Sequence, residues 1–176
     1  MKKIVLISVL LLVLANISRA QKDITVKMQF NGVGLQIVLP VLFDHRITMD
    51  QLLKEQKGPH YVQDDLEGAI KVGDFKETVK DTTVVNTEVT IIYNPNLSAK
   101  ELKVQIVKEG LCSLTIKEFL EFGLQYPYLL SRMCNIMSIE NYNGKYPVMG
   151  SDRDNANLWA IMSRNKISDW YITKKK

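Results

Sequence analysis

The sequence predicts an α+β fold, with a small mixed β-sheet and one packed helix in the N-terminal half and a mainly helical C-terminal part. Apolar and polar side chains alternate strictly over residues 24–30, which is typical of a strand with one buried face. Residues 83–93 are rich in β-branched side chains and indicate another strand. Helix caps and broad apolar helix faces become common after residue 97, so we expect helices to dominate there.

The N-terminal half opens with a predicted hairpin. Residues 31–34 contain two glycines and an asparagine, which favour a tight turn, and residues 35–43 form an almost wholly apolar second strand. Pro40 removes a backbone donor inside that strand, which favours an edge position or a bulge. Thr48 is placed to cap a helix over residues 49–57, and a Gly-Pro pair ends it.

The second half is expected to contain four helices and a closing strand over residues 166–173, whereas the polar residues 60–81 receive no assignment. Each helix follows a capping residue or a proline at its first turn. The first three expected helices are 98–109, capped by Ser98, 115–125, with the capping box Thr115–Glu118, and 127–140, which starts at Pro127. The fourth is capped by Ser151 and carries Leu158, Trp159, Ile161 and Met162.

The first twenty residues have the three regions of a cleavable signal peptide. Lys2 and Lys3 precede an apolar run over residues 4–15, and Ser18 and Ala20 are the small residues that a signal peptidase recognises. This run is too short to cross about 30 Å of hydrocarbon as a stable helix, so a retained anchor is the weaker alternative. We expect a secreted or periplasmic protein, cut after Ala20, with no integral membrane segment after cleavage. The expected regions are 1–20 (signal peptide), 21–96 (β-rich) and 97–176 (mainly helical, ending in a short strand), the last two packed as one unit.

Cleavage changes the charge of the chain. It removes three basic residues and no acidic one, so the formal net charge falls from +4 to +1. Three lysines at residues 174–176 form a basic C-terminal end, and no basic patch is found elsewhere. Nucleic-acid binding needs a patch that displaces counterions from phosphates, so a nucleic-acid partner is not expected.

Strand, glycine turn, strand, helix, polar middle and closing strand follow one another over residues 23–94. In this order the stretch resembles ubiquitin-like β-grasp domains, with Gly34 in the first turn and residues 87–93 as the last strand. No Gly-Gly pair follows that strand, so the resemblance does not imply conjugation chemistry. It implies a scaffold that presents a sheet face or edge to a partner, and a generic α+β sandwich is the alternative.

Two cysteines, Cys112 and Cys134, lie in a chain addressed to an oxidising compartment, which favours one disulfide. Closing this loop would contribute about 3 kcal/mol in the chain-entropy model. Two buried thiols are the alternative.

A small exported hydrolase or transpeptidase that uses Cys112 with His45 or His60 as base is also considered. The residues around Cys112 match no nucleophile signature, so no catalytic residue is assigned.

No metal site and no cofactor are predicted. His45 and His60 each lie near aspartates, but their spacing does not bring them together. Met133, Cys134 and Met137 form a soft-ligand set suited to Cu(I), but the packing of a helix into a core explains them more simply.

Aromatic side chains concentrate in the last third of the chain. Tyr142, Tyr146, Trp159 and Trp170 are the candidate binding residues, because exposed rings commonly anchor a protein or sugar ligand. Sealing of a C-terminal core is the alternative. Because no catalytic constellation is found, we expect a non-enzymatic exported protein that binds another protein through its N-terminal sheet or the loop over residues 142–146.

Overall fold

The computed structural model describes residues 27–31, 34–55, 68, 70, 83–133, 135–151 and 158–176. Eight strands in these ranges form one sheet in the order β1-β2-β3-β8-β5-β6-β7, and β4 pairs with the end of β8. The strands are β1 (Lys27–Asn31), β2 (Gly34–Asp44), β3 (Val84–Tyr93), β4 (Leu111–Cys112), β5 (Asn135–Ser138), β6 (Tyr146–Ser151), β7 (Leu158–Ser163) and β8 (Trp170–Lys175). The helices are α2 (Met49–Glu55), α3 (Ala99–Lys108), α4 (Ile116–Gln125) and α5 (Pro127–Met133).

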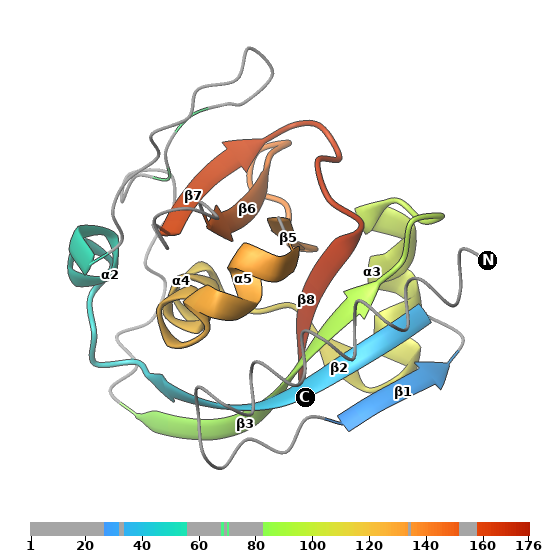
Figure 1. The fold of residues 1–176 in the computed structure, drawn as a ribbon, viewed down its shortest axis with the longest axis horizontal. Coiled ribbons are helices and arrows are strands. Elements are labelled where there is room, and N and C mark those ends of the chain that lie inside the picture. Colours follow the sequence, from blue (N-terminus) through green and yellow to red (C-terminus); the bar gives the residue numbers. More distant parts are fainter. Residues whose placement is uncertain are drawn as a thin grey trace.

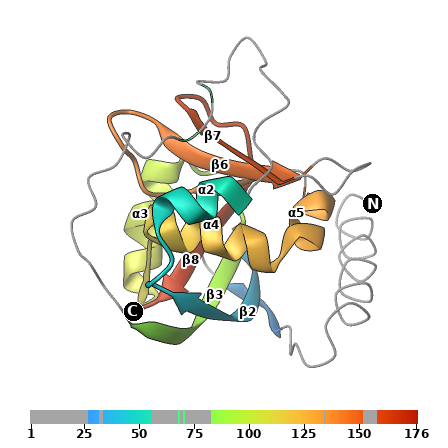
Figure 2. The ribbon, with the colours of Figure 1, turned by 90° about the vertical axis from the view of Figure 1, so that its left-hand side faces the viewer.

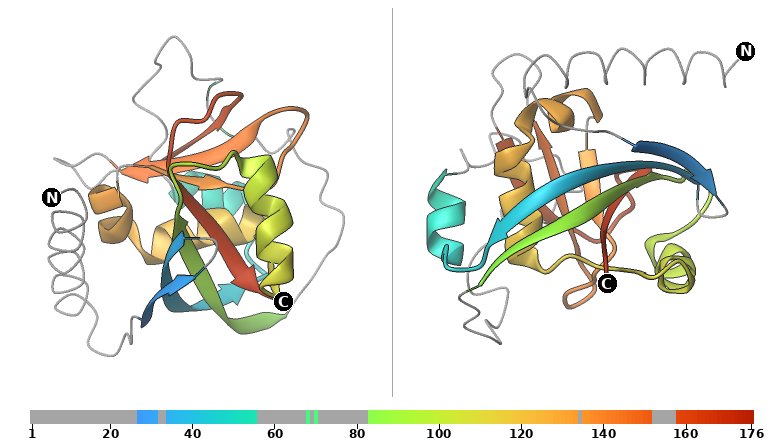
Figure 3. Two further views of the ribbon diagram at one scale, coloured as in Figure 1. Left: turned by 90° about the vertical axis from the view of Figure 1, so that its right-hand side faces the viewer. Right: turned by 90° about the horizontal axis from the view of Figure 1, so that it is seen from below.

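The sheet curves around α4 and α5, whereas α3 lies against its other face (Figure 1 and Figure 2). We call the face toward α4 and α5 the inner face and the opposite one the outer face. β2 and β3 form a long curved ribbon along one side of the molecule (Figure 3). β5 and β8 are parallel and the other strand pairs are antiparallel, so the sheet is mixed.

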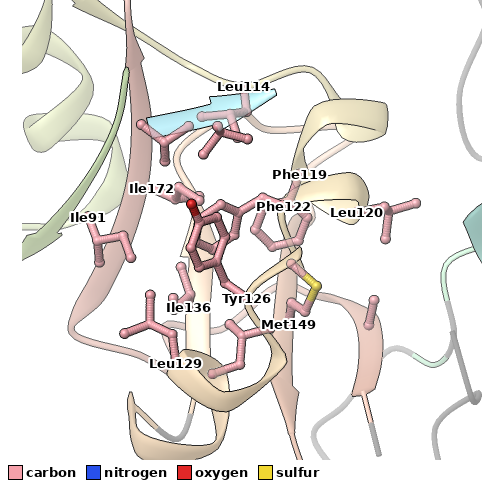
Figure 4. Packing of buried hydrophobic residues seen from close by; sticks show 14 of the residues in the cluster. Ile91, Leu114, Phe119, Leu120, Phe122, Tyr126, Leu129, Ile136, Met149 and Ile172 are labelled. Carbon is pink, nitrogen blue, oxygen red and sulfur yellow. The ribbon is translucent and has the colours of Figure 1, made fainter. Parts of the chain in front are cut away.

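An apolar core fills the space inside the curve of the sheet. Ile37, Ile91 and Ile172 lie opposite one another on β2, β3 and β8, and all three are fully buried. Phe119 and Phe122 of α4 pack in the same core, as Figure 4 shows. Each such side chain contributes roughly 1.5–3 kcal/mol when it leaves water, so this core holds the helix to the sheet.

A second apolar core covers the outer face. Leu102 and Ile106 of α3 are buried there together with Ile92 of β3 and Tyr171 of β8. The Tyr171 hydroxyl donates to the carbonyl of Leu97 at 3.1 Å, so its buried polar atom has a partner. The middle of the sheet is therefore covered on both faces.

The predicted helix starts are confirmed at α3 and α4. The Ser98 side chain accepts from the backbone N–H of Glu101, and the Glu101 carboxylate accepts from the N–H of Ser98. Thr115 and Glu118 form the same reciprocal pair at the start of α4. Such caps depend only on residues three apart in the chain, which is why the sequence alone predicts them.

The predicted fold class is wrong. Strands β4 to β8 all lie after residue 97, so the C-terminal part is not mainly helical. The helix expected over residues 127–140 ends at Met133, and β5 follows it. Ile136 lies in the inner core and Met137 in the outer core, as expected for a strand buried on both faces. Such a strand has a continuous apolar run, which does not differ in pattern from a buried helix.

The helix expected after Ser151 is also wrong. Ser151 ends β6, and the residues expected on the helix form β7. Leu158 and Met162 belong to the inner core, whereas Trp159 and Ile161 pack with the outer core. Neighbouring apolar residues therefore point to opposite faces, and their spacing matched a helix only because both faces are covered.

The N-terminal region does not form a small sheet of its own. The order β1, β2, α2, β3 is the predicted strand–strand–helix–strand sequence. However, β3 pairs with β8 along residues 89–93, so the first three strands continue into the C-terminal half as one sheet. The proposed β-grasp unit is therefore replaced by one side of an eight-stranded sheet.

Candidate functional site

Helix α4 places two carboxylates inside the molecule. Glu118 and Glu121 are one helical turn apart, and their residues are 1% and 4% exposed. Both point from α4 toward the end of β2, where the chain turns into α2. Buried carboxylates are costly unless they are paired or hydrogen bonded, so their partners decide what this cluster does.

Glu118 joins three parts of the fold. Its Oε1 is 2.5 Å from Nζ of Lys174 on β8 and 3.3 Å from Nε2 of His45 in the turn after β2. Its Oε2 accepts from the backbone N–H of Thr115 at 2.9 Å. Burial opposes the charge of Glu118, but the hydrogen bonds from Lys174 and Thr115 outweigh it and lower the pKa of this carboxyl. The carboxylate is thus a charged junction between β8, α4 and the end of β2.

Glu121 has the opposite environment. Its Oε1 accepts from the backbone N–H of Asp44 at 2.5 Å, and its buried Oε2 has no hydrogen-bond partner among the residues that the structure describes. Burial raises the pKa of this carboxyl, and the Asp44 hydrogen bond only partly offsets that effect. The Asp44 carboxylate itself binds Arg46, whose hydrogen bond lowers the pKa of Asp44 to about 2.

Three side chains of the α4 region bind one edge of β2. Glu121 binds the N–H of Asp44, Nε2 of Gln125 donates to the carbonyl of Leu42 at 2.8 Å, and the Tyr126 hydroxyl donates to the carbonyl of Pro40. β1 pairs only with residues 34–38 of β2, so α4 covers the edge that β1 leaves free. Pro40 therefore lies at an edge, one of the two positions that the sequence predicted.

These contacts are structural in character. They satisfy backbone groups or pair charges between elements, and both oxygens of Glu118 are occupied by other parts of the same chain. Sequence reasoning missed Glu118 as a junction residue and did not single out Glu121. A usable signal was present, because two acids stand one turn apart among the apolar residues of α4. Lys174, which the sequence places in a basic C-terminal end, lies in β8 and contacts Glu118.

Of the two predicted disulfide partners, Cys112 is among the described residues. Cys112 is a free, half-buried thiol in β4, where it lies opposite Lys174 and its Sγ is 4.0 Å from the carbonyl of Lys175. Cys134 lies outside the described residues. Its neighbour Asn135 accepts from the Ser168 hydroxyl at 2.6 Å, just before β8 begins. The Cys112–Cys134 disulfide stays a prediction.

The cysteine-hydrolase alternative needed a histidine beside Cys112. His45 Nε2 contacts Glu118, which also binds Lys174, the residue opposite Cys112 in the sheet. The imidazole of His45 is thus paired with a carboxylate of α4, and that carboxylate also binds the residue opposite Cys112. His60 lies outside the described residues.

The structure separates the candidate soft metal ligands. Met133 belongs to the inner core and Met137 to the outer core. In the described ranges, no three His, Cys, Asp or Glu side chains gather closely enough to hold a metal ion.

The four candidate aromatic residues are half-buried and divide between the two faces of the sheet. Tyr142 and Trp170 pack against the inner core, whereas Tyr146 and Trp159 pack against the outer core. The Trp170 ring is 4.8 Å from the Tyr93 ring, measured between centroids. Burial raises the pKa of the Tyr142 hydroxyl, which the backbone of Ile116 contacts. The four rings do not form one patch, and a binding role for any of them stays a prediction.

Apolar side chains are exposed at the end of the β2–β3 ribbon. Leu42 is 55% exposed and Val84 is 45% exposed. Leu42 lies opposite Asn86, two residues from Val84, so the two side chains are diagonal neighbours on the outer face. Pro40 is exposed on the same face. We call Pro40, Leu42 and Val84 the ribbon-end patch.

Comparisons with protein-family models, with curated proteins and with solved structures gave no match to this chain. None of the helices in the described ranges is both long and apolar enough to cross a bilayer. The local chemistry is therefore the basis for a functional proposal.

Proposed function

We propose that the chain is exported, loses residues 1–20, and acts in the extracellular space or periplasm by binding another protein. The ribbon-end patch is the observation that carries this proposal. A leucine and a valine that share one sheet face and stay about half exposed are suited to burial against a partner. No cofactor is needed for such a role, and the buried carboxylates of α4 already serve the fold itself.

The polar surroundings of the patch fit a protein interface. Asp44 and Asn86 lie on the same face beside Val84 and Leu42, and Glu88 lies opposite Pro40. Apolar residues with a polar rim are the common arrangement at protein–protein contacts. The rim is polar, and its carboxylates at Asp44 and Glu88 pair with Arg46 and Lys175, so a protein partner is favoured over nucleic acid, which needs a basic patch.

The experiment is capture of the native partner by the purified exported protein. Immobilised wild-type protein is incubated with the extracellular or periplasmic fraction of the producing cells, and bound proteins are crosslinked and identified by mass spectrometry. Val84→Asp is compared with Val104→Asp, because Val104 is 60% exposed on α3 and serves as a matched control.

We expect Val84→Asp to weaken retention of the partner by about tenfold or more, because a carboxylate would be buried in the interface. Val104→Asp should retain it. A wild-type protein that retains no specific partner would contradict the binding function. If both variants retain the partner equally, the ribbon-end patch is not part of the interface.

A further inference from the structure

The connection between β5 and β6 contains a tight turn with an Asn-Gly pair at its tip. The N–H of Tyr142 donates to the carbonyl of Lys145 at 2.8 Å, and the N–H of Lys145 donates back to the carbonyl of Tyr142 at 3.0 Å. Asn143 and Gly144 are therefore the two central residues of a hairpin turn, and their φ angles are 55° and 83°. Positive φ at both central positions is typical of a type I′ turn, which favours Asn followed by Gly.

The same two residue types are suited to a spontaneous chemical modification. The backbone nitrogen of the residue after an asparagine can attack the side-chain amide carbon, because an unstrained succinimide ring results. Glycine at that position permits the approach most readily, since it has no side chain beside the attacking nitrogen. The sequence contains this pair at residues 31–32 and 143–144, and the second pair lies wholly within the described ranges.

The tip of the turn is open to water. Asn143 and Gly144 are exposed, whereas Tyr142 and Lys145 beside them are half-buried. A Cβ atom added to Gly144 would meet no heavy atom of the described residues within 4 Å, so the space beside this glycine is open. Packing therefore does not keep water from a ring formed at this position.

A neighbouring side chain holds the attacking nitrogen. The N–H of Gly144 donates to Oδ1 of Asn141 at 2.8 Å, which is an ordinary hydrogen-bond distance. The nitrogen has to lose this proton and approach the side chain of Asn143, so its bond to Asn141 must break first. The intact turn consequently slows the reaction, and the Asn141 amide is the side chain that restrains it.

We propose that Asn143 is a site of spontaneous deamidation and that the Asn141 side chain limits its rate. The Gly144 nitrogen forms a bond to Cγ of Asn143, and the bond from Cγ to the amide nitrogen breaks. Ammonia leaves with the proton of the Gly144 N–H. Water then opens the succinimide at either carbonyl, which gives aspartate or isoaspartate. One water is consumed and one ammonia is released, with no oxidation or reduction.

The products alter the turn in two ways. Both place a carboxylate at a tip whose two central residues are uncharged. Isoaspartate also adds a methylene to the backbone, so the reciprocal bonds between Tyr142 and Lys145 should no longer both form. Deamidation thus loosens the segment that holds the candidate binding residues Tyr142 and Tyr146. The reaction needs no partner protein, so its outcome is independent of the proposed binding function.

The test follows residue 143 in the purified exported protein during incubation at neutral and mildly alkaline pH. Samples are digested, and the peptide that contains Asn143 is fragmented to distinguish asparagine, aspartate and isoaspartate. Incubation in heavy-oxygen water labels the product, because one oxygen of the new carboxylate comes from the solvent. We expect both acids to accumulate, and to do so faster at the higher pH, because the attacking nitrogen must be deprotonated.

Asn141→Ala and Asn141→Asp are the matched variants. Alanine removes the acceptor, whereas aspartate keeps an oxygen that can accept from the N–H of Gly144. We expect conversion of Asn143 to become about three- to tenfold faster in Asn141→Ala, as the loss of one hydrogen bond predicts, and to stay within about twofold of wild type in Asn141→Asp. In concentrated urea the turn is lost, so wild type and Asn141→Ala should react at the same rate.

Each part of the inference has its own contradicting result. If Asn143 stays unmodified in folded wild type and in folded Asn141→Ala while the urea-unfolded chain reacts, residue 143 is not a deamidation site of the native protein. Aspartate without isoaspartate would indicate direct hydrolysis and would overturn attack by Gly144. Equal rates in folded wild type and Asn141→Ala, or equal acceleration by Asn141→Ala and Asn141→Asp, would overturn the restraint by the Asn141 hydrogen bond.

Discussion

Replacing Glu118 by glutamine tests whether this buried carboxylate holds β8, α4 and the end of β2 together. The amide oxygen can still accept from the N–H of Thr115, but the charge that Lys174 and His45 contact is lost. A hydrogen bond between charged groups contributes about 1.5–3 kcal/mol, and the short contact to Lys174 is the principal one. We expect the free energy of unfolding to fall by about 2–3 kcal/mol at neutral pH, which lowers Tm by about 5–10 °C for a chain of this length.

The effect should depend on pH in a defined direction. The pKa of Glu118 is lowered from its ordinary value of 4.5, so its carboxylate stabilises the fold fully above that value. This contribution is lost as the pH falls through the folded-state pKa. The difference between wild type and Glu118→Gln should therefore be largest near neutral pH and shrink as the pH falls below 4.5 and through the folded-state pKa, measured by urea unfolding followed through tryptophan fluorescence.

Lys174→Met provides the matched control, because it removes the other partner of the same contact. A double-mutant cycle should give a coupling energy of at least about 1 kcal/mol between Glu118 and Lys174. Unchanged stability of Glu118→Gln at neutral pH, or additive effects of the two substitutions, would refute a stabilising junction.

Three further predictions follow from neighbouring groups. Burial raises the pKa of Glu121, so its ionisation destabilises the fold as the pH rises; Glu121→Gln should be at least as stable as wild type at neutral pH, and a large loss in urea unfolding would contradict this. Tyr126→Phe leaves the carbonyl of Pro40 without its hydroxyl partner and should lower the unfolding free energy by about 1 kcal/mol, whereas an unchanged urea midpoint would argue against its role at the edge. The free Cys112 thiol should react with iodoacetamide without prior reduction, as shown by intact mass; protection of both cysteines until reduction would instead support the predicted Cys112–Cys134 disulfide.

The local parts of the fold are predictable from the sequence. The caps of α3 and α4 use residues three apart, and the first hairpin follows from alternation and a glycine turn. Each of these features depends on neighbours in the chain, so no knowledge of the tertiary structure is needed.

The α4 cluster depends on distant contacts. Glu118 binds Lys174, which is 56 residues away in the sequence, and Gln125 binds Leu42, which is 83 residues away. Two acids on an apolar helix face indicate that partners are required, but they do not say which residues supply them.

The sequence by itself determined where several helices and strands begin, and it predicted a leader at residues 1–20. Only the tertiary structure decided that β5 and β7 are strands, because the sheet is buried on both faces there. Because packed side chains cover both faces of such a strand, apolar residues follow one another along it, and the alternation that identifies a half-buried strand is lost. Burial on two faces is a property of the assembled sheet, so no local pattern could reveal it.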